Sequence, residues 1–238
     1  MKKHGFTLAE VLVTLGIIGV VAALTTPALI QNVGNAKVGP KLQKAVATFE
    51  TASEMMLTDQ NSNTLLGVST TSAGLGKALG QYMKINRGDE SAASAINYKS
   101  YTNSNMTVYS SQNPSSLGNR FDSEEGMIYY ILNNGSKTQV HSDYADIPNN
   151  QEIGRVSVDI NGPDGPNTVA KDLFVFALYN DGTLRPWGSP GYKRHVKASE
   201  IGDIWSGSSY PCNKTTVKGN GESCTGSIFD NGMKIIYQ

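Results

Sequence analysis

The sequence predicts an α+β protein in which a long N-terminal helix packs, by its second half, against an antiparallel β-sheet head. Three observations support this fold class. Residues 6–24 are almost entirely apolar, residues 42–56 repeat apolar side chains at three- and four-residue spacing, and strand patterns with hairpin turns lie after residue 126. The expected organisation is a leader at 1–5, a transmembrane helix at 6–30, its amphipathic second half at 31–58 and a globular head at 59–238.

The N-terminal apolar segment is long enough to cross a membrane. No charged residue occurs between Glu10 and Lys37. As a helix, residues 6–24 would span about 28 Å, close to the roughly 30 Å of a bilayer's hydrocarbon core. Because Lys2 and Lys3 precede the segment, the positive-inside tendency predicts a cytoplasmic N-terminus, with the rest of the chain outside the cytoplasm.

One carboxylate, that of Glu10, lies near the start of the apolar segment. Insertion scales give about 2.5 to 3.5 kcal/mol for a charged residue at the centre of a membrane helix, so this carboxylate needs a partner. Cleavage between Gly5 and Phe6 would create an amino group near the depth of Glu10. The natural partner is then the Phe6 amine of a neighbouring subunit, and Glu10 is expected to be unpaired in a single copy of the chain.

The string GFTLAEVLVTL at residues 5–15 follows a short lysine-rich leader. It closely resembles the N-terminus shared by type IV prepilins and type II secretion pseudopilins. The resemblance implies that a prepilin peptidase cuts after Gly5 and methylates the exposed amine of Phe6. It also implies that Glu10 docks on another subunit's amine during filament assembly and that Pro27 interrupts the helix. It covers about the first thirty residues of the chain.

The resemblance implies a structural subunit rather than an enzyme. Such a subunit waits in the inner membrane as a single-pass precursor, with lipid around its helix and its head outside the cytoplasm. An inner-membrane assembly platform then extracts it into a pilus or a secretion pseudopilus, where its helix bundles with those of other pilin or pseudopilin subunits. The alternative is a membrane-anchored periplasmic binding protein or enzyme that does not polymerise.

An amphipathic helix is expected after the membrane segment. A polar stretch that contains glycine leads to Gly39 and Pro40, and proline suits the first turn of a helix. Either a new helix begins there, or the membrane helix continues to residue 58 as one rod of about 80 Å. The expected packed face consists of Leu42, Ala45, Val46, Phe49, Ala52 and Met56.

The head is expected to be an antiparallel sheet packed on the long helix. Residues 59–112 are rich in Ser, Asn, Thr and Ala, which predicts a long irregular connection with one short helix at 75–84. Asn134-Gly135 and Asp181-Gly182 mark tight hairpins between apolar runs. Strand patterns occur at 127–132, 137–141, 155–160, 173–179 and 234–237.

Cys212 and Cys224 enclose a short loop in the part of the chain expected outside the cytoplasm. Oxidation is favoured in such a compartment. A disulfide here would stabilise the fold by about 3 kcal/mol, chiefly by restricting the unfolded chain. The family resemblance likewise implies a C-terminal region bounded by a disulfide. Two unpaired thiols are the alternative.

A loop rich in side-chain oxygens is a candidate calcium site, and calcium is the one cofactor that the sequence suggests. Hard cations such as calcium prefer carboxylate and amide oxygens. The EF-hand pattern is absent, because the fifth and twelfth places of the loop are Pro163 and Ala170. The same residue types also favour turns, which is the alternative explanation. The candidate ligands are Asp159, Asn161, Asp164, Asn167 and Asp172.

Composition argues against several other functions. The chain of 238 residues has 20 Lys+Arg and 20 Asp+Glu, so it lacks the excess positive charge typical of nucleic-acid binding. The cluster Lys193-Arg194-His195 is better explained by a solvated loop than by DNA capture. Two cysteines exclude a four-cysteine zinc site. No HExxH, P-loop or GxSxG motif occurs, and the sequence predicts no enzyme.

Overall fold

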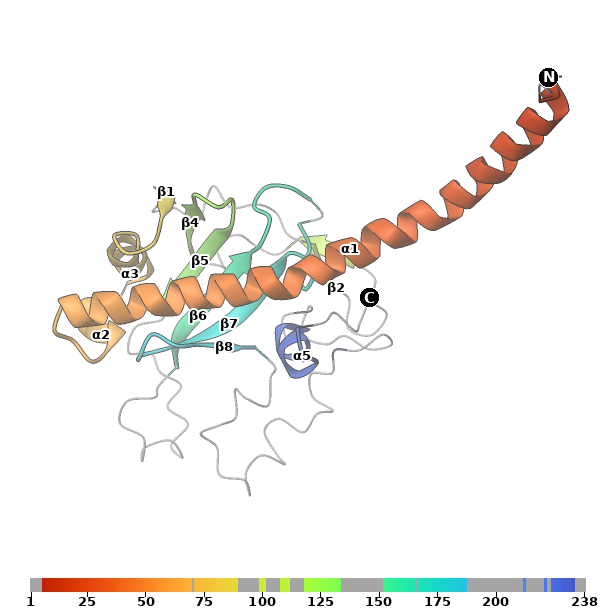
Figure 1. The fold of residues 1–238 in the computed structure, drawn as a ribbon. Coiled ribbons are helices and arrows are strands. Elements are labelled where there is room, and N and C mark those ends of the chain that lie inside the picture. The colour runs from red at the N-terminus through yellow and green to blue at the C-terminus, as the bar shows by residue number, and fades with distance from the viewer. Residues whose placement is uncertain are drawn as a thin grey trace. The chain divides into compact units, whose positions relative to one another are not determined.

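A computed structural model describes residues 6–69, 71–89, 99–101, 108–111, 118–133, 152–165, 167–187, 212, 221 and 224–233. The chain divides into two compact units, Met1–Lys37 and Val38–Gln238. The first unit contains the N-terminal part of helix α1 (Leu8–Asp59), and the second contains the rest of this helix and the head (Figure 1).

Helix α1 continues through Pro27 and Pro40. The interruption expected at Pro27 is therefore absent, and α1 is one continuous helix, which is one of the two possibilities that the sequence left. A proline removes only one backbone donor, a loss that the many turns on either side of it offset. The hydroxyls of Thr25 and Thr26 donate hydrogen bonds of 2.9 and 2.7 Å to the carbonyl oxygens of Val21 and Ala22, one turn earlier in the same helix.

Gly39 lies within α1 at the point where Met233 comes close to the helix, and it does not mark a helix boundary. A Cβ atom at this position would overlap the carbonyl oxygen and the Cβ of Met233. Met233 follows helix α5 (Cys224–Asp230) and packs against the hydrophobic core. A larger side chain at residue 39 would therefore push the C-terminal segment away from α1, which explains why a residue of low helix propensity lies within this helix.

The head is built on a six-stranded sheet in which all neighbouring strands are antiparallel (Figure 1). Two further strands, β2 (Lys99–Tyr101) and β3 (Val108–Ser111), form a separate antiparallel pair. The six strands, in their order across the sheet, are β1 (Ile85–Asp89), β4 (Asn119–Ser123), β5 (Ile128–Asn133), β6 (Glu152–Asp159), β7 (Leu173–Tyr179) and β8 (Leu184–Pro186).

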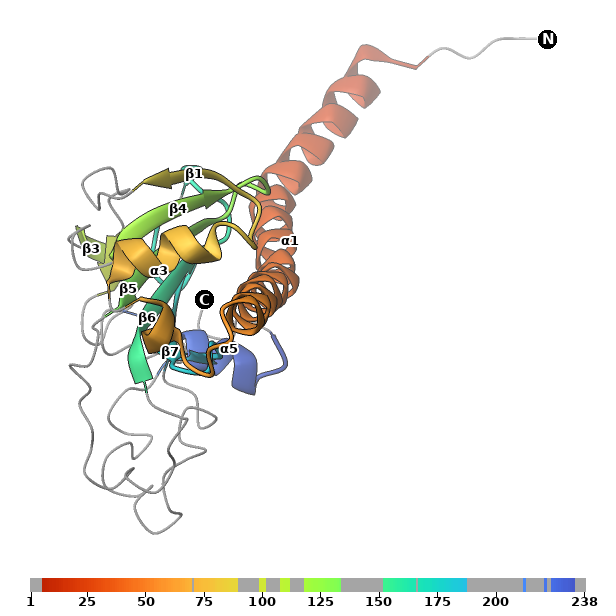
Figure 2. The same cartoon turned by 90° about the vertical axis from the view of Figure 1, so that its left-hand side faces the viewer.

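The hydrophobic core lies between the second half of α1 and one face of the sheet, as the sequence predicts. The predicted apolar face of α1 is confirmed, since Leu42, Ala45, Phe49 and Met56 are fully buried and Ala52 nearly so, while Val46 is partly buried and packs against them. Figure 2 shows helix α3 (Ser72–Leu79) beside β4 and β5, and its apolar residues join the same core. The sheet contributes Phe121, Tyr129, Ile131, Val156, Val158, Phe174, Phe176 and Leu178.

The strands expected from apolar patterns are confirmed where the structure describes them. The expected segments at 127–132, 155–160 and 173–179 correspond to β5, β6 and β7. The hairpin predicted at Asp181-Gly182 joins β7 to β8, with the Tyr179 N–H donating to the Thr183 carbonyl oxygen at 3.0 Å. The hairpin expected at Asn134-Gly135 and the strands expected at 137–141 and 234–237 lie outside the described residues.

The connection after α1 contains more regular structure than the sequence predicts. Helix α2 (Leu65–Val68) follows the N-cap Thr64, and α3 begins after the N-cap Thr71, whose hydroxyl oxygen accepts a hydrogen bond from the Gly74 N–H at 3.1 Å. Helix α3 therefore begins and ends earlier than the helix expected at 75–84, because Thr71 caps its N-terminus. Strand β1 was also missed, since its residues form a strand only by pairing with β4.

Candidate functional site

The N-terminal part of α1 exposes a continuous apolar surface. Leu8–Pro27 is the one span in the described part of the chain whose length and composition suit a membrane crossing, and none of the most apolar stretch within it is buried. Large side chains such as Leu12, Ile18 and Leu24 are 62%, 63% and 74% exposed. Monomeric soluble proteins rarely expose apolar patches this large. This surface therefore requires lipid or other helices around it.

Glu10 lies at the start of α1 and is held by Thr7, the residue just before the helix. The Thr7 N–H and the Thr7 hydroxyl both donate to Glu10 Oε2 at 2.8 Å. In return, the Glu10 N–H donates to Thr7 Oγ1 at 3.3 Å. This is a capping box, which satisfies donors that a helix N-terminus would otherwise leave without partners. The negative charge also interacts favourably with the helix dipole.

The capping box corrects the expectation that Glu10 is unpaired in a single copy. Its Oε2 atom has two hydrogen-bond donors within its own chain, whereas Oε1 accepts no hydrogen bond from the described residues. The carboxylate is thus oriented by Thr7 and keeps one oxygen for an outside partner. The sequence signal for the box, Thr7 followed three residues later by Glu10 before an apolar run, is present but was overlooked.

Phe6 precedes the capping box and is 88% exposed. Gly5, the other half of the predicted cleavage site, lies outside the described residues. The arrangement places Phe6, Thr7 and Glu10 within one turn of the helix start. Cleavage after Gly5 would therefore create a positive amine one residue away from the group that orients the carboxylate.

The disulfide predicted from the sequence joins Cys212 to Cys224, whose Cα atoms are 5.1 Å apart. Cys224 is the first residue of α5 and is fully buried. The Thr225 hydroxyl accepts a hydrogen bond from the Val175 N–H of β7 at 2.9 Å. The Ser227 hydroxyl donates to the Cys212 carbonyl oxygen at 3.3 Å. The disulfide therefore closes a loop whose C-terminal end is held against the sheet by the hydrogen bond between Thr225 and Val175.

Reduction of this disulfide is expected to lower the free energy of unfolding by about 3 kcal/mol, because the unfolded chain regains the freedom of the open loop. Urea unfolding of the full chain in detergent, with and without reductant, measures the difference. A variant with Cys212→Ser and Cys224→Ser is the control and should not respond to reductant. Equal stability of the oxidised and reduced wild type would contradict the expectation.

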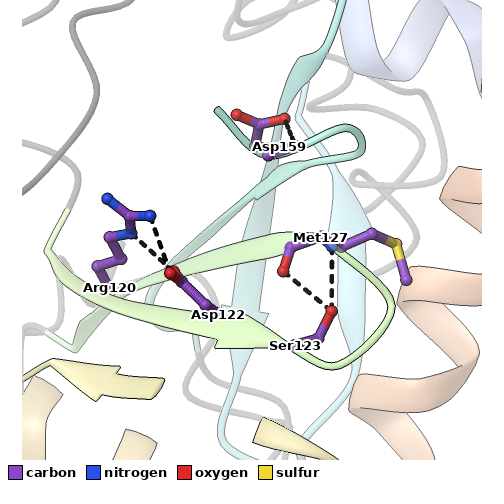
Figure 3. Close-up of polar contacts among 6 residues, drawn as sticks. Arg120, Asp122, Ser123, Met127 and Asp159 are labelled. Atoms are coloured by element: carbon purple, nitrogen blue, oxygen red, sulfur yellow. Dashed lines mark hydrogen bonds and ion pairs between the residues drawn. The ribbon is translucent and has the colours of Figure 1, made fainter. Parts of the chain in front are cut away.

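The five candidate calcium ligands lie in a loop after β6, but the structure gives them hydrogen bonds within that loop. Asp159 is fully buried at the end of β6 (Figure 3). Its Oδ1 accepts the N–H groups of Asn161 and Gly162 at 3.0 and 2.8 Å. The Asn161 amide donates to the carbonyl oxygen of Asp164 at 2.6 Å. These are the bonds of a turn.

Asp172 closes the other end of this loop and is only 2% exposed. Its two carboxylate oxygens accept the N–H groups of Asn167 and Thr168, both at 2.6 Å. Burial raises the pKa of Asp172 above its usual range, and hydrogen bonds from Thr168, Asn167 and nearby backbone N–H groups oppose this shift. The carboxylate therefore organises the loop backbone.

The described residues contain no group of three or more His, Cys, Asp or Glu side chains that could hold a metal ion. Asp159 and Asp172 use carboxylate oxygens on backbone donors, while the buried Oδ1 atoms of Asn161 and Asn167 have no hydrogen-bond partner among the described residues. The bonds of a turn account for Oδ1 of Asp159 and for both carboxylate oxygens of Asp172. Calcium binding at this loop stays a prediction.

Asp172→Asn is expected to lower the free energy of unfolding by about 1 to 3 kcal/mol, because an amide offers one acceptor oxygen where the carboxylate uses two. Urea unfolding of the full chain measures this loss. Asp164→Asn is the matched control in the same loop, since the Asp164 side chain is exposed and only its carbonyl oxygen accepts a hydrogen bond. Equal effects of the two substitutions would contradict the structural role of Asp172.

The basic cluster at Lys193, Arg194, His195 and Lys197 lies outside the described residues. Trp187, at the edge of that segment, is described. Its ring lies under the Arg155 guanidinium, 4.1 Å from the ring centroid. Trp187 therefore makes a cation–π interaction with Arg155 of β6.

The comparison with known families agrees with the geometry of the N-terminus. Residues 1–26 match the family of the prokaryotic N-terminal methylation motif. No curated protein and no solved structure matches the chain. The matched residues include Phe6, the capping box and most of the exposed apolar span. The chain thus carries the N-terminal signature of type IV pilins and pseudopilins, on a helix that fits a membrane-anchored precursor.

Proposed function

We propose that this protein is a structural subunit of a type IV pilus or a type II secretion pseudopilus. The prepilin peptidase cuts after Gly5 and methylates the amine of Phe6. The processed helix waits in the inner membrane with the head outside the cytoplasm. The inner-membrane assembly platform then moves it into a filament whose core consists of N-terminal helices.

The observation that supports this proposal is the carboxylate of Glu10 at the start of an exposed apolar helix. Thr7 holds one of its oxygens and leaves Oε1 without a donor among the described residues. In a filament, the Phe6 amine of a neighbouring copy donates to this oxygen. The ion pair neutralises two charges in an apolar environment and sets the register between subunits, a use of buried ion pairs that serves specificity more than stability.

The first experiment determines the intact mass and the N-terminal sequence of the protein recovered from its native cell. The proposal requires a chain that begins at N-methylated Phe6. A strain without the prepilin peptidase is the control and should contain the chain with residues 1–5 retained. An unprocessed Met1 in the native cell would show an anchored monomer instead. A cut near Thr25, next to the small residues Ala22 and Ala23 that resemble a signal-peptide cleavage site, would show a secreted one.

Filament formation is the second requirement of the proposal. Residues on the exposed face of the N-terminal helix, replaced one at a time by cysteine, should crosslink helix to helix in ladders. A membrane-anchored monomer should give no ladder. The exposed residue Ile17, which is 60% exposed, is a suitable position because it lies in the middle of the apolar span.

A further inference from the structure

In the head, different charged residues lie on the two sides of helix α1. On one side, between α1 and the segment that holds β1, β4 and β5, lies a groove of about 420 Å³. Its charged residues are Lys44, Lys84 and Glu125, and the buried residues Met83, Met127 and Tyr129 also line it. We call it the basic groove.

On the other side of α1, next to the hairpin between β7 and β8, lies a pocket of about 890 Å³. Its charged residues are Glu50, Glu54 and Asp181. Polar residues such as Asn61 and Thr183 complete it. We call it the acidic pocket. The two cavities share no lining residue and flank α1 at opposite edges of the sheet.

Three carboxylates, those of Glu50, Glu54 and Asp181, line the acidic pocket, and no basic residue is among its described lining residues. Glu50 accepts the Leu184 N–H at 2.9 Å. Burial raises the pKa of Glu50, and the nearby charge of Asp181 raises it further, while Arg185 and the Leu184 hydrogen bond lower it. Glu54 is exposed at the same pocket. A cationic partner would therefore be attracted to this side of the helix.

In the basic groove, Lys44 can exchange its present partner for another carboxylate at a small cost in free energy. Lys44 pairs with Glu125 at 2.7 Å, but the two side chains are 60% and 43% exposed. Exposed ion pairs contribute only about 0 to 1 kcal/mol. Lys84 is exposed beside this pair. A carboxylate from outside can therefore enter the groove and meet two lysines above an apolar floor.

We propose that Glu54, at the acidic pocket of one copy of this chain, places its carboxylate in the basic groove of the next copy. Because the two surfaces are different, the contact is head-to-tail, and such contacts build open helical filaments when the rotation does not close. The proposal rests on the proposed function and names the part of the head that contacts the neighbouring subunit.

The order of charges along α1 sets the direction of the stagger between parallel copies. Lys44 and Glu54 are ten residues apart, which is about 15 Å along a helix. A stagger of this size brings the Glu54 of one copy level with the Lys44 of the next. The carboxylate lies after the cation along the chain, as it does for Phe6 and Glu10. Both contacts therefore require a stagger in the same direction, of about 6 Å for Phe6 and Glu10 and about 15 Å for Lys44 and Glu54, so each joins a different pair of copies in the filament.

A charge-reversal swap in the full-length chain tests the contact. Glu54→Lys and Lys84→Glu, made separately, should each reduce the sheared filament fraction about tenfold, since like charges then face each other. The double variant should restore the yield to within about twofold, because the pair is re-formed with reversed signs. Lys77→Glu, an exposed lysine of α3 outside the groove, is the matched control and should assemble normally.

Normal filament yields from both single variants, or no rescue by the double variant, would overturn the contact. Thermal unfolding of each variant in detergent checks that the head still folds. The two proposals fail in different ways. If Glu10→Gln abolishes filaments while Lys84→Glu does not, the proposed function stands and this contact is wrong. If the native protein keeps Met1 and forms no filament, the proposed function itself is wrong.

Discussion

Glu10→Gln is expected to abolish filament formation while leaving cleavage after Gly5 intact. Glutamine still accepts the hydrogen bonds of Thr7, because Glu and Gln both complete a capping box. It lacks the negative charge, so the Phe6 amine of the neighbour would be buried without a counter-charge. Removal of one partner of a buried ion pair typically costs about 3 to 5 kcal/mol. The sheared filament fraction and the mass of the membrane-bound subunit measure the two outcomes.

Three further variants separate the charge of Glu10 from its role in the capping box. Thr7→Ser keeps the hydroxyl and should assemble normally. Glu10→Val removes both the cap and the charge and should also fail to assemble while its leader is still removed. Asp59→Asn is a matched control for the loss of one carboxylate from the same helix, and its processing and assembly should be normal. Normal filaments from Glu10→Gln would show that assembly does not need the charge.

Phe49→Ala is expected to lower the free energy of unfolding of the head by about 3 to 5 kcal/mol, the usual loss for a buried phenylalanine. Phe49 is fully buried, and its ring centroid lies 6.4 Å from that of Tyr129. The Tyr129 hydroxyl donates to the Ala45 carbonyl oxygen of α1 at 3.4 Å. The substitution would leave a cavity where the helix meets the sheet.

Urea unfolding of the full chain in detergent, followed by tryptophan fluorescence, measures this loss. Met55→Ala is the matched control, because Met55 lies on the same helix but is 51% exposed. The free energy of unfolding of this variant should change by less than about 0.5 kcal/mol. Equal losses from the two substitutions would mean that α1 is not held to the sheet by this face.

Features with a local signal in the chain were predicted well. The apolar segment behind Glu10 follows from composition, and the buried face of α1 follows from the spacing of Leu42, Phe49 and Met56. Strand β7 matches its expected bounds, because its residues are all apolar or aromatic and Asp181-Gly182 ends the run with turn residues. In each case neighbouring residues alone carry the information.

Features that depend on distant residues were not predicted. Strands β1 and β4 contain charged and polar residues, and they form a sheet edge only by pairing with each other and with β5. Arg120 and Asp122 of β4 also form a bidentate ion pair within the strand, at 2.7 and 2.8 Å (Figure 3). The energy of pairing one strand with another is absent from any single segment.

The sequence by itself determined the N-terminal motif, the apolar helix behind it, the α+β class and the Cys212–Cys224 pair, because charge, hydropathy and turn chemistry are local properties. Only the tertiary structure decided that Gly39 admits Met233 and that Asp172 holds a turn. It also decided that the groove beside Lys44 and the pocket beside Glu54 lie on different sides of α1. These features depend on which distant groups become neighbours, and packing sets that.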